Sequence, residues 1–474
     1  MRDSKSWAAA EFGEAALGDV RRTARLVDLA AEVASRPAGT VLQACSSSAS
    51  REGAFRLLEN VAIQPLAIRE AMVRSTMRRC KGERRVFVAI DGSSLGLTDN
   101  ARSKGLGGVG AWSMGGRGVQ VMTALAMEED GSVLGIGAQH MWSRESRSPH
   151  GERGATAKGA TSENTIWLQL LKDTHREFAK AAPECRPWFQ MDRGADCRQV
   201  LELSIQLGLL VTVRAAHDRR TDAEGHLWSV LQERPVLARR QIQASARPPH
   251  QRCKRVGGKR IKMHVPARKP RVATVEVRAA SVAIQCKTPS SRTPITININ
   301  AVYVREVNRT GEDQLEWMLL TTHPVSTRRA ALEVVRGYAL RWRIEEFHRL
   351  WKTGLCHVED TQLRSRDAVH KWATILAAVA TRAMRITHLA RSTPDVPAST
   401  EFSPSELAAL IALRQPKGIR EDHVPSLAEA VRWIADLGGY TGPWNGPPGA
   451  IVIGRGLYDV LVASRAFESR DKMR

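Results

Sequence analysis

Four residues of the sequence have types and spacings that could act on phosphate groups: Tyr338, Arg341, Glu345 and Lys352. On a straight helix their offsets of 0, 3, 7 and 14 residues fall within a stripe of roughly 60°. An acid flanked by two cations and a phenol suits a metal ligand whose neighbours bind phosphate. Arg341 can bind a phosphate bidentately, and Lys352 can bind one as a point charge. A salt-bridged surface helix is the alternative, which Arg343 and Glu346 on other faces fit equally well.

Two further acids, Asp91 and Asp192, each follow a short apolar run that is rich in β-forming residues, 84–90 and 187–191. Taken singly, an aspartate after a strand is more often a turn or cap residue. Carboxylates at strand ends lie at the rim of a sheet, and three such acids, with Glu345 as the third, would repel one another unless divalent cations neutralised them. Carboxylate oxygens suit Mg²⁺ or Mn²⁺, and two such ions can promote cleavage of a phosphodiester.

The charge of the chain requires an anionic partner. In 474 residues, 71 Lys+Arg stand against 49 Asp+Glu, a formal net charge of +22, which favours nucleic acid first and an anionic membrane surface second. No apolar run approaches the ~20 residues of a membrane-spanning helix, and the N-terminus does not resemble a signal peptide. The seven cysteines have no zinc-ligand or redox spacing. We therefore expect a cytoplasmic, nucleoid-associated protein without a membrane partner.

The elements that must position these residues alternate between strands and helices, which predicts a mixed α/β sheet. Helices are expected at 20–35, 51–58, 65–77, 162–182, 200–207, 327–353 and 368–390, and strands at 84–90, 119–127, 133–141, 187–191, 209–214 and 315–321. A turn at 128–131 joins two of the strands as a hairpin. The arginines of the first helices form either a DNA-binding module or a solvated face, with equal weight.

Residues 221–305 have the character of an insertion. The run Arg252–Arg271 contains about nine basic residues and no acidic one, and strands are expected at 272–277, 281–286 and 295–304. The last of these alternates, with Ile297 and Ile299 on one face and Asn298 on the other. A Pro/Ser-rich linker at 392–405 then leads to short helices at 405–413, 426–437 and 454–467.

The motif Tyr338-xx-Arg341-xxx-Glu345-xxxxxx-Lys352 resembles the tyrosine–arginine–glutamate–lysine signature of the insertion-sequence-four family of bacterial DDE transposases. Further similar stretches are 15–19 with 21–27, 52–56 and 192–196. The resemblance implies a ribonuclease-H-like catalytic core with a β-rich insertion, flanked by helical N- and C-terminal domains. Its implied boundaries are a DNA-end-binding domain at 1–75, a catalytic domain at 76–220 and 306–390, a basic insertion at 221–305 and a dimerisation region at 391–474.

The same resemblance implies the role of each residue. Asp91, Asp192 and Glu345 become the catalytic acids that hold two Mg²⁺ or Mn²⁺ ions, in preference to Asp99 and Asp196. Trp317 matches an aromatic residue that stacks on a flipped base, which suits a π surface. The remaining DNA-binding residues are Tyr338, Arg341, Lys352, Arg349, Arg214, Arg21, Arg22, Arg25 and Arg56. Residues 116–120 lack the paired tryptophans that a relative carries there.

The implied function is a cut-and-paste DNA transposase. It would bind terminal inverted repeats of double-stranded DNA as a homodimer, hydrolyse phosphodiesters, form hairpins and transfer strands into target DNA. Two alternatives stay open: a ribonuclease-H-like nuclease without strand transfer, and a catalytically decayed DNA-binding relative of a transposase.

Overall fold

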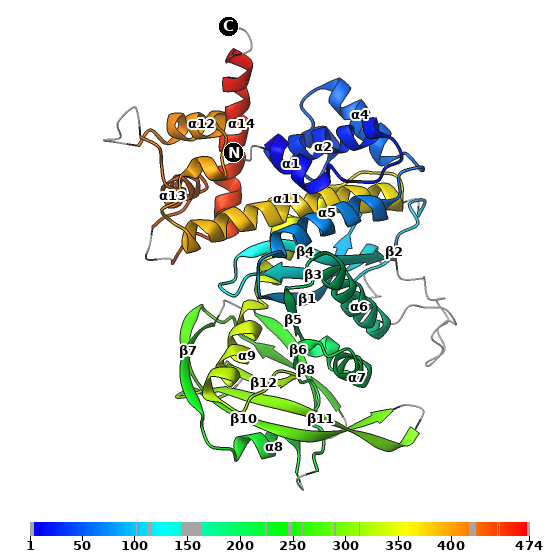
Figure 1. Cartoon of the computed structure of the whole chain (residues 1–474), viewed down its shortest axis with the longest axis vertical. Coiled ribbons are helices and arrows are strands. Elements are labelled where there is room, and N and C mark those ends of the chain that lie inside the picture. The colour runs from blue at the N-terminus through cyan, green and yellow to red at the C-terminus, as the bar shows by residue number, and fades with distance from the viewer. Residues whose placement is uncertain are drawn as a thin grey trace. The chain divides into compact units, whose positions relative to one another are not determined.

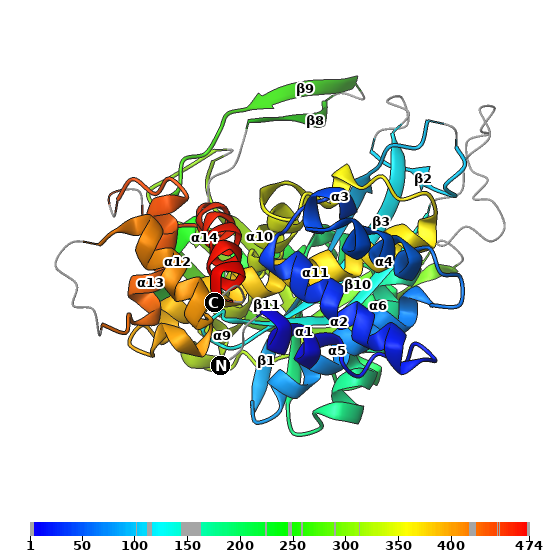
Figure 2. The same cartoon turned by 90° about the horizontal axis from the view of Figure 1, so that it is seen from above.

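The structure is a computed structural model that describes residues 4–100, 102–110, 116–143, 163–222, 225–244, 249–256, 259–288, 291–311, 313–416, 423–442, 444 and 446–471. The chain divides into two compact units. The first consists of Met1–Pro187 and Trp342–Arg474, and the second of Trp188–Arg341. Figures 1 and 2 show the helices and strands of both units.

The first unit begins with five helices: α1 (Ser4–Phe12), α2 (Val20–Ser35), α3 (Val41–Ala44), α4 (Ser48–Leu58) and α5 (Pro65–Cys80). Asp19 caps α2, because its side chain accepts a hydrogen bond from the Arg21 N–H. Pro65 opens α5, where an N–H would have no partner within the helix. The predicted helices are confirmed, and α4 begins three residues earlier than expected because Ser47 caps it.

The sheet of the first unit contains β1 (Arg85–Gly96), β2 (Gly107–Gly108), β3 (Arg117–Met127) and β4 (Val133–Trp142), and β3 pairs with the other three. The prediction that the first strand ends at Asp91 is wrong. β1 and β3 stay paired from Phe87↔Met127 to Gly96↔Gly118, so the strand continues through Asp91. The predicted hairpin turn is confirmed, since the Glu128 N–H donates to the Ser132 carbonyl at 2.9 Å.

Helix α6 (Glu163–Ala181) packs on β3 and β4, and the long helix α11 (Arg366–Ser392) packs on β4 and α5. Two side chains of α11 hold the N-terminal helices. Lys371 Nζ donates to the Leu58 carbonyl at 2.8 Å, and Trp372 Nε1 donates to the Gly39 carbonyl at 2.7 Å. The chain between residues 15 and 60 is therefore tied to the core of the first unit.

The predicted continuous helix 327–353 is wrong. Helix α9 (Arg328–Leu340) ends before α10 (Arg343–Arg349) begins, and a π-helical turn, η3 (Leu350–Gly354), follows. The stripe of roughly 60° assumed a straight α-helix with 3.6 residues per turn, so it does not describe these residues. The break at residues 341–342 also separates the two units.

The last helices of the first unit are α12 (Pro404–Arg414), α13 (Leu427–Leu437) and α14 (Ala450–Asp471). Capping boxes start two of them, with Ser403 paired to Glu406 and Ser426 paired to Glu429. Phe402, Leu410 and Ile434 belong to the apolar core that these helices share. The predicted tail helices are thus confirmed, although α14 begins four residues earlier.

The sheet of the second unit has the spatial order β5 (Arg186–Met191), β6 (Leu210–Arg214), β12 (Glu316–Thr321), β11 (Ser291–Glu306), β10 (Arg271–Thr288) and β7 (Ala238–Ala244). β5 and β6 are parallel and joined by α7 (Arg198–Gln206), whereas the other neighbours pair antiparallel. α9 packs on this sheet, and α8 (Leu227–Gln232) contacts β10 and β11.

The insertion differs in two ways from its prediction. The strands expected at 272–277 and 281–286 form one strand, β10, because it pairs continuously with the long β11. The predicted alternation in β11 is confirmed, with Ile297 and Ile299 buried and Asn298 exposed. The second difference lies in the basic run Arg252–Arg271, where no strand was expected and where β8 (His250–Val256) and β9 (Lys259–Val265) pair as a separate ribbon (Figure 2).

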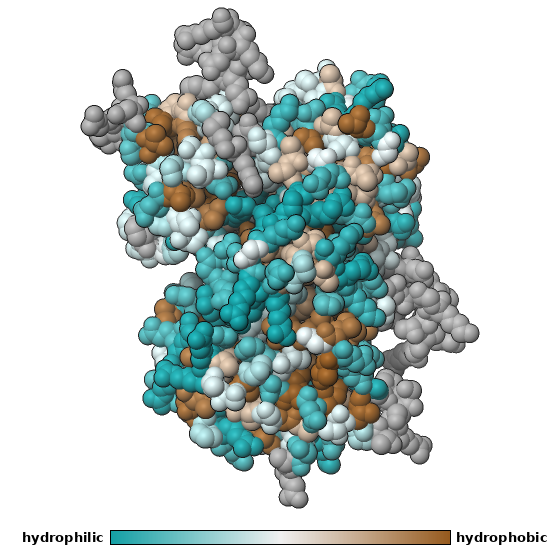
Figure 3. All heavy atoms as spheres, viewed as in Figure 1, coloured by the Kyte–Doolittle hydropathy of each residue, from teal (hydrophilic) through white to brown (hydrophobic). Residues whose placement is uncertain are grey.

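Within the described ranges, no helix is long and apolar enough to cross a membrane. Hydrophilic residues cover most of the face shown in Figure 3, with smaller hydrophobic areas between them.

Candidate active site and DNA-binding surface

Asp91 and Glu345 lie on two elements of the first unit that pack against each other, β1 and α10. Asp91 is opposite Thr123 in the β1–β3 ladder, and its carboxylate accepts a hydrogen bond of 2.8 Å from the Gly92 N–H. Glu345 lies in the first turn of α10, where the positive end of the helix dipole favours a carboxylate. Both side chains are half-buried. The first unit thus places two of the predicted acids on neighbouring elements.

Lys352 is also held against β1. Its ammonium group donates to the Ser94 carbonyl at 2.7 Å and lies 3.4 Å from the carboxylate of Glu359. Glu359 in turn accepts a hydrogen bond of 2.7 Å from the Gly96 N–H. Glu359 was not predicted from the sequence, because its partner Gly96 on β1 is 263 residues away. Lys352 is therefore positioned by β1 as well as by its own turn.

Glu346, the neighbour of Glu345, has a different environment. Its carboxylate pairs with Arg343 at 2.7 Å and lies 3.9 Å from the His388 ring. Burial lowers the pKa of His388 to about 2, and the nearby Arg343 and Arg391 add to this effect. His388 is therefore neutral beside Glu346, and the arginine is the cation that balances this acid. Glu346 therefore fits the alternative prediction of a salt-bridged surface helix.

Asp192 follows β5 directly, as predicted. Its carboxylate accepts a hydrogen bond of 2.8 Å from the Gly194 N–H and caps the short helix η2 (Arg193–Ala195). Because β5 and β6 are parallel, with Met191 opposite Val213, their carboxyl ends meet at one edge of the sheet. Asp192 and Arg214 are therefore neighbours in register at this edge of the second unit.

Arg214 has hydrogen-bonding capacity that the described protein atoms do not use. One guanidinium nitrogen donates to the Glu316 carbonyl at 2.9 Å, while the buried Nε has no hydrogen-bond partner. A buried donor without an acceptor is unfavourable, so such groups are frequently satisfied by a ligand. A phosphate oxygen is an acceptor of the required kind.

Trp317, Tyr338 and Arg341 form a cluster in the second unit. The rings of Trp317 and Tyr338 meet edge to face, with centroids 5.1 Å apart, and the Arg341 guanidinium carbon lies 5.9 Å from the Tyr338 ring centroid. Tyr338 is buried, whereas Trp317 and Arg341 are half-buried. The Trp317 indole is thus braced on one side and partly accessible, which is the condition for stacking on a base.

Two other aspartates near the predicted acids are bound by arginines. Asp196 has a fully buried side chain that pairs with Arg219 at 2.7 Å and accepts from the Ala216 N–H at 2.6 Å. The buried Asp99 lies 3.6 Å from Arg117. Asp99 and Asp196 are therefore each held by an arginine of the described chain.

The donor set of the predicted acids fits a divalent cation, because carboxylate oxygens are the preferred ligands of Mg²⁺ and Mn²⁺. Among the residues that the structure describes, no group of three or more His, Cys, Asp and Glu forms a complete metal site. Asp91 and Glu345 belong to the first unit and Asp192 to the second. Their action as one metal centre is a proposal that is argued below.

Comparison with known protein families gives two matches. The model described as "Transposase DDE domain" matches residues 83–382, and the model described as "Transposase DNA-binding" matches residues 4–63. The first match covers more than half of the chain. The chain belongs to the DDE transposase family. A DDE transposase domain implies a ribonuclease-H-like fold and a general use of divalent metal ions, and the mixed α/β architecture is compatible with that fold.

The match at 4–63 makes DNA a partner of this transposase, and it includes the four N-terminal arginines. The exposed Arg21 has no ion pair or side-chain hydrogen bond in the described structure. Arg22 donates to the Leu17 carbonyl at 3.1 Å, and Arg25 donates to the Ala49 carbonyl at 3.1 Å. Arg56 pairs with Glu52. Of the four, Arg21 has the guanidinium most available to DNA.

The Arg25 side chain lies against Gly53 of α4. A Cβ at Gly53 would lie 1.5 Å from the Arg25 guanidinium, so a side chain at this position of α4 would displace Arg25 from its present place. Arg25 therefore has a structural contact within the DNA-binding domain.

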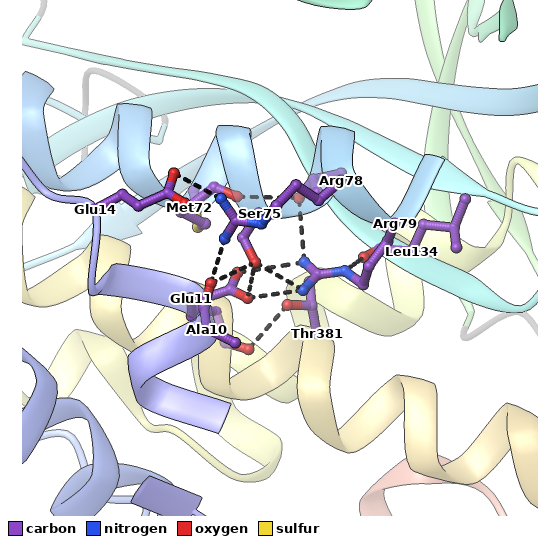
Figure 4. A network of polar contacts seen from close by, with 11 residues as sticks. Ala10, Glu11, Glu14, Met72, Ser75, Arg78, Arg79, Leu134 and Thr381 are labelled. Carbon is purple, nitrogen blue, oxygen red and sulfur yellow. Dashed lines mark hydrogen bonds and ion pairs between the residues drawn. The ribbon is translucent and has the colours of Figure 1, made fainter. Parts of the chain in front are cut away.

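A buried polar network ties the DNA-binding domain of the transposase to the rest of the first unit (Figure 4). Glu11 of α1, which is 2% exposed, pairs with Arg79 of α5 at 2.8 Å and accepts from Ser75 Oγ at 2.9 Å. Arg79 also donates to the Leu134 carbonyl of β4. A charged pair at this depth is stable only with such complete hydrogen bonding, so α1 is held in one position against α5 and β4.

Proposed function

We propose that this chain is a cut-and-paste DNA transposase of the insertion-sequence-four family. The observation that carries the proposal is the DDE domain match at 83–382, which includes Asp91, Asp192, Glu345 and the whole Tyr338–Lys352 motif without a departure. The strings 341–348 and 351–354 resemble the transposase of transposon five, the kanamycin-resistance element.

In this proposal, Asp91, Asp192 and Glu345 are the ligands of two Mg²⁺ or Mn²⁺ ions. When bound, such ions lower the pKa of an attacking water or hydroxyl and stabilise the leaving oxygen. The chain itself holds the DNA. Tyr338, Arg341, Arg349 and Lys352 bind phosphates of the transposon end, and the free Nε of Arg214 binds a phosphate beside Asp192.

The reaction consists of repeated in-line displacements at phosphorus. Water first nicks one strand and releases a 3′-hydroxyl, which attacks the opposite strand and closes a hairpin. A second water opens the hairpin, and the 3′-hydroxyl then attacks target DNA. Trp317 stacks on a base that leaves the helix during hairpin formation. No step needs a covalent bond to the protein.

The domain assignment belongs to the same proposal, with end binding at 1–75, catalysis at 76–220 and 306–390, a basic insertion at 221–305 and dimerisation at 391–474. Two protomers pair two transposon ends and cut them in trans. Exposed apolar side chains in the last region, Ile411, Leu413, Trp444, Tyr458 and Val462, support its role as an interface.

The substitution Glu345→Gln tests the metal assignment. It removes the charge of one ligand with little change of shape, so we expect cutting to fall to background while binding to the inverted repeat that borders the gene changes less than about twofold. Glu346→Gln is the matched control, because it is the same change on the next residue of α10, and it should retain cutting. A Glu345→Gln protein that cuts at the wild-type rate contradicts the assignment.

A second assay separates the transposase from the two alternatives. A pre-cut inverted-repeat end, a target plasmid and Mg²⁺ are mixed with the protein, and joined products are counted. A transposase joins the end to the plasmid. A nuclease without strand transfer cuts DNA but does not join it. A decayed relative neither cuts nor joins, and it binds DNA equally well with or without Mg²⁺.

A further inference from the structure

An open hollow of about 380 Å³ lies on the second unit, away from the residues discussed so far. It is lined by Arg240 of β7 and by five residues of α9: Arg328, Arg329, Leu332, Glu333 and Arg336. In Figure 1, α9 and β7 lie beside each other, and Figure 3 shows hydrophilic residues gathered over this part of the unit. Four arginines thus face one hollow with a single acid among them.

The charge of this hollow is not balanced within the described protein. Glu333 is occupied by Arg329, at 3.2 Å, and lies 3.7 Å from the His323 ring. Arg240, Arg328 and Arg336 are exposed and have no ion pair or side-chain hydrogen bond in the described ranges. Three unpaired cations around one hollow make the local potential positive, which attracts an anion.

The start of α9 strengthens this preference. Its first turn contains two arginines and no acid, although the N-terminus of a helix already has a partial positive charge. This placement is unfavourable for the helix itself, and it becomes favourable when an anion lies beside the first turn.

The hollow faces away from the proposed site of the transposon end. At about 100° per residue, Arg336 and Leu332 point about 160° and 120° away from Tyr338 around the axis of α9. Tyr338 packs on Trp317, whereas Arg336 faces the hollow. A helix with its side chains is about 10–12 Å wide, so the hollow and Tyr338 lie on opposite sides of α9, with the body of the helix between them.

The sequence after β7 continues the positive charge. β7 is the edge strand of the sheet, and the chain runs from it into the ribbon β8–β9 within the acid-free basic run Arg252–Arg271. Exposed arginines on an edge strand, followed by a basic ribbon, are suited to a long polyanion more than to a single small anion.

We propose that the hollow formed by Arg240, Arg328 and Arg336 binds the phosphate backbone of the target duplex, as a site separate from the one that holds the transposon end. The ligand is double-stranded DNA of any sequence, because arginines on phosphates carry no sequence information. The identification of this duplex as the target rests on the proposed function.

The experiment uses the full-length protein bound to an unlabelled inverted-repeat duplex, in EDTA so that no chemistry occurs. A fluorescent 30-bp duplex without the repeat is then titrated in, and its anisotropy is measured at several salt concentrations. The test variant is Arg240→Ala/Arg328→Ala/Arg336→Ala. The matched control, Arg220→Ala/Arg234→Ala/Arg305→Ala, removes three exposed arginines of the same unit whose side chains form no ion pair or hydrogen bond within the described ranges.

We expect the test variant to bind the second duplex about tenfold more weakly and to lose about 2.7 units of salt slope, which corresponds to three phosphate contacts. Its affinity for the inverted-repeat duplex should change less than about twofold, and the control variant should change both affinities less than about twofold. An equal loss in test and control variants overturns the proposal. An equal loss for the two duplexes does so too, because the hollow would then hold the transposon end.

If the triple variant does not fold, the single substitution Arg336→Gln is used instead. It should lower the affinity for the second duplex about twofold to threefold. Because these measurements need no cutting, they also separate this proposal from the proposed function. A wild-type protein that does not join ends to a plasmid contradicts the proposed function. The proposal for the hollow is decided separately, by whether the test variant loses affinity for the second duplex.

Discussion

Trp317 occupies a position in which a packing role and a DNA role can be separated by experiment. Its ring meets Tyr338 edge to face at 5.1 Å, so it contributes to the second unit, but it is only half-buried. Stacking on an unpaired base contributes about 1–3 kcal/mol. That contribution matters only in the step in which a base is flipped, whereas a packing defect would affect every step.

We therefore predict that Trp317→Ala slows hairpin closure roughly fivefold to a hundredfold while the first nick changes less than about threefold. Nicked and hairpin products are separated on a denaturing gel over time. Trp317→Phe is the control, because it keeps an aromatic face and should restore most of the hairpin rate. Equal slowing of both steps by Trp317→Ala would show that the residue acts through packing alone.

At the scale of helices and strands, local patterns predicted most elements, and long-range pairing decided the exceptions. The helix at 20–35 begins after a capping aspartate and the helix at 65–80 begins with a proline, and both signals are local in sequence. β1 continues past Asp91 through Gly92, Ser93 and Ser94, which are poor strand formers, because β3 lies opposite them in the antiparallel ladder. A single sequence carries no record of that pairing.

The helix that contains the motif shows the same limit. Residues 340–343 include neither Gly nor Pro, so nothing local predicted the end of α9 at Leu340 or the π-helical turn at 350–354. The spacing of the four motif residues was nevertheless informative, since family resemblance preserves spacing whether or not the helix is straight. The acids of the candidate site were predicted from their positions, whereas Glu359 and the arginine partners of Asp99 and Asp196 required the structure.

Helix α11 makes the stability of the first unit dependent on pH. Burial lowers the pKa of His388 to about 2 and that of His370 to about 4, with smaller effects from Arg343 and Arg366, respectively. In the unfolded chain both titrate near the ordinary value of 6.5, so below that pH the unfolded state binds more protons than the folded state. The contribution of each histidine to stability is therefore fully present above pH 6.5 and is lost as the pH falls toward its folded pKa.

We predict that the free energy of unfolding falls by up to about 1.4 kcal/mol per pH unit and per histidine between pH 6 and pH 4.5. Thermal unfolding followed by circular dichroism at pH 7.5, 6 and 5 measures this. His388→Gln should be less stable at pH 7.5 but lose less of its Tm on acidification, whereas His217→Gln, at an exposed position, should lose as much as the wild type. A His388→Gln protein with the wild-type dependence on pH would contradict the assignment to α11.

At the scale of the whole molecule, the net charge of +22 now has identified locations. Arg21 is available on the DNA-binding domain, the unpaired arginines of the hollow lie on the second unit, and the run Arg252–Arg271 is basic throughout. Some of the acids near these cations form ion pairs, such as Glu52 with Arg56 and Glu346 with Arg343. In the proposed function, DNA affinity therefore rests mainly on these cations, whereas cutting rests on Asp91, Asp192 and Glu345.

This separation predicts how binding responds to salt and to metal. If six to ten phosphates are neutralised, affinity for the inverted-repeat duplex should fall by about 10³–10⁵ between 50 and 200 mM salt, because each contact releases condensed counterions. EDTA should leave affinity unchanged at constant ionic strength, since the acids that hold metal are not needed for phosphate contacts. Anisotropy titrations with and without EDTA at four salt concentrations measure both quantities. A fall of less than tenfold would mean that base contacts dominate, and a loss of binding in EDTA would mean that the metal helps to hold the DNA.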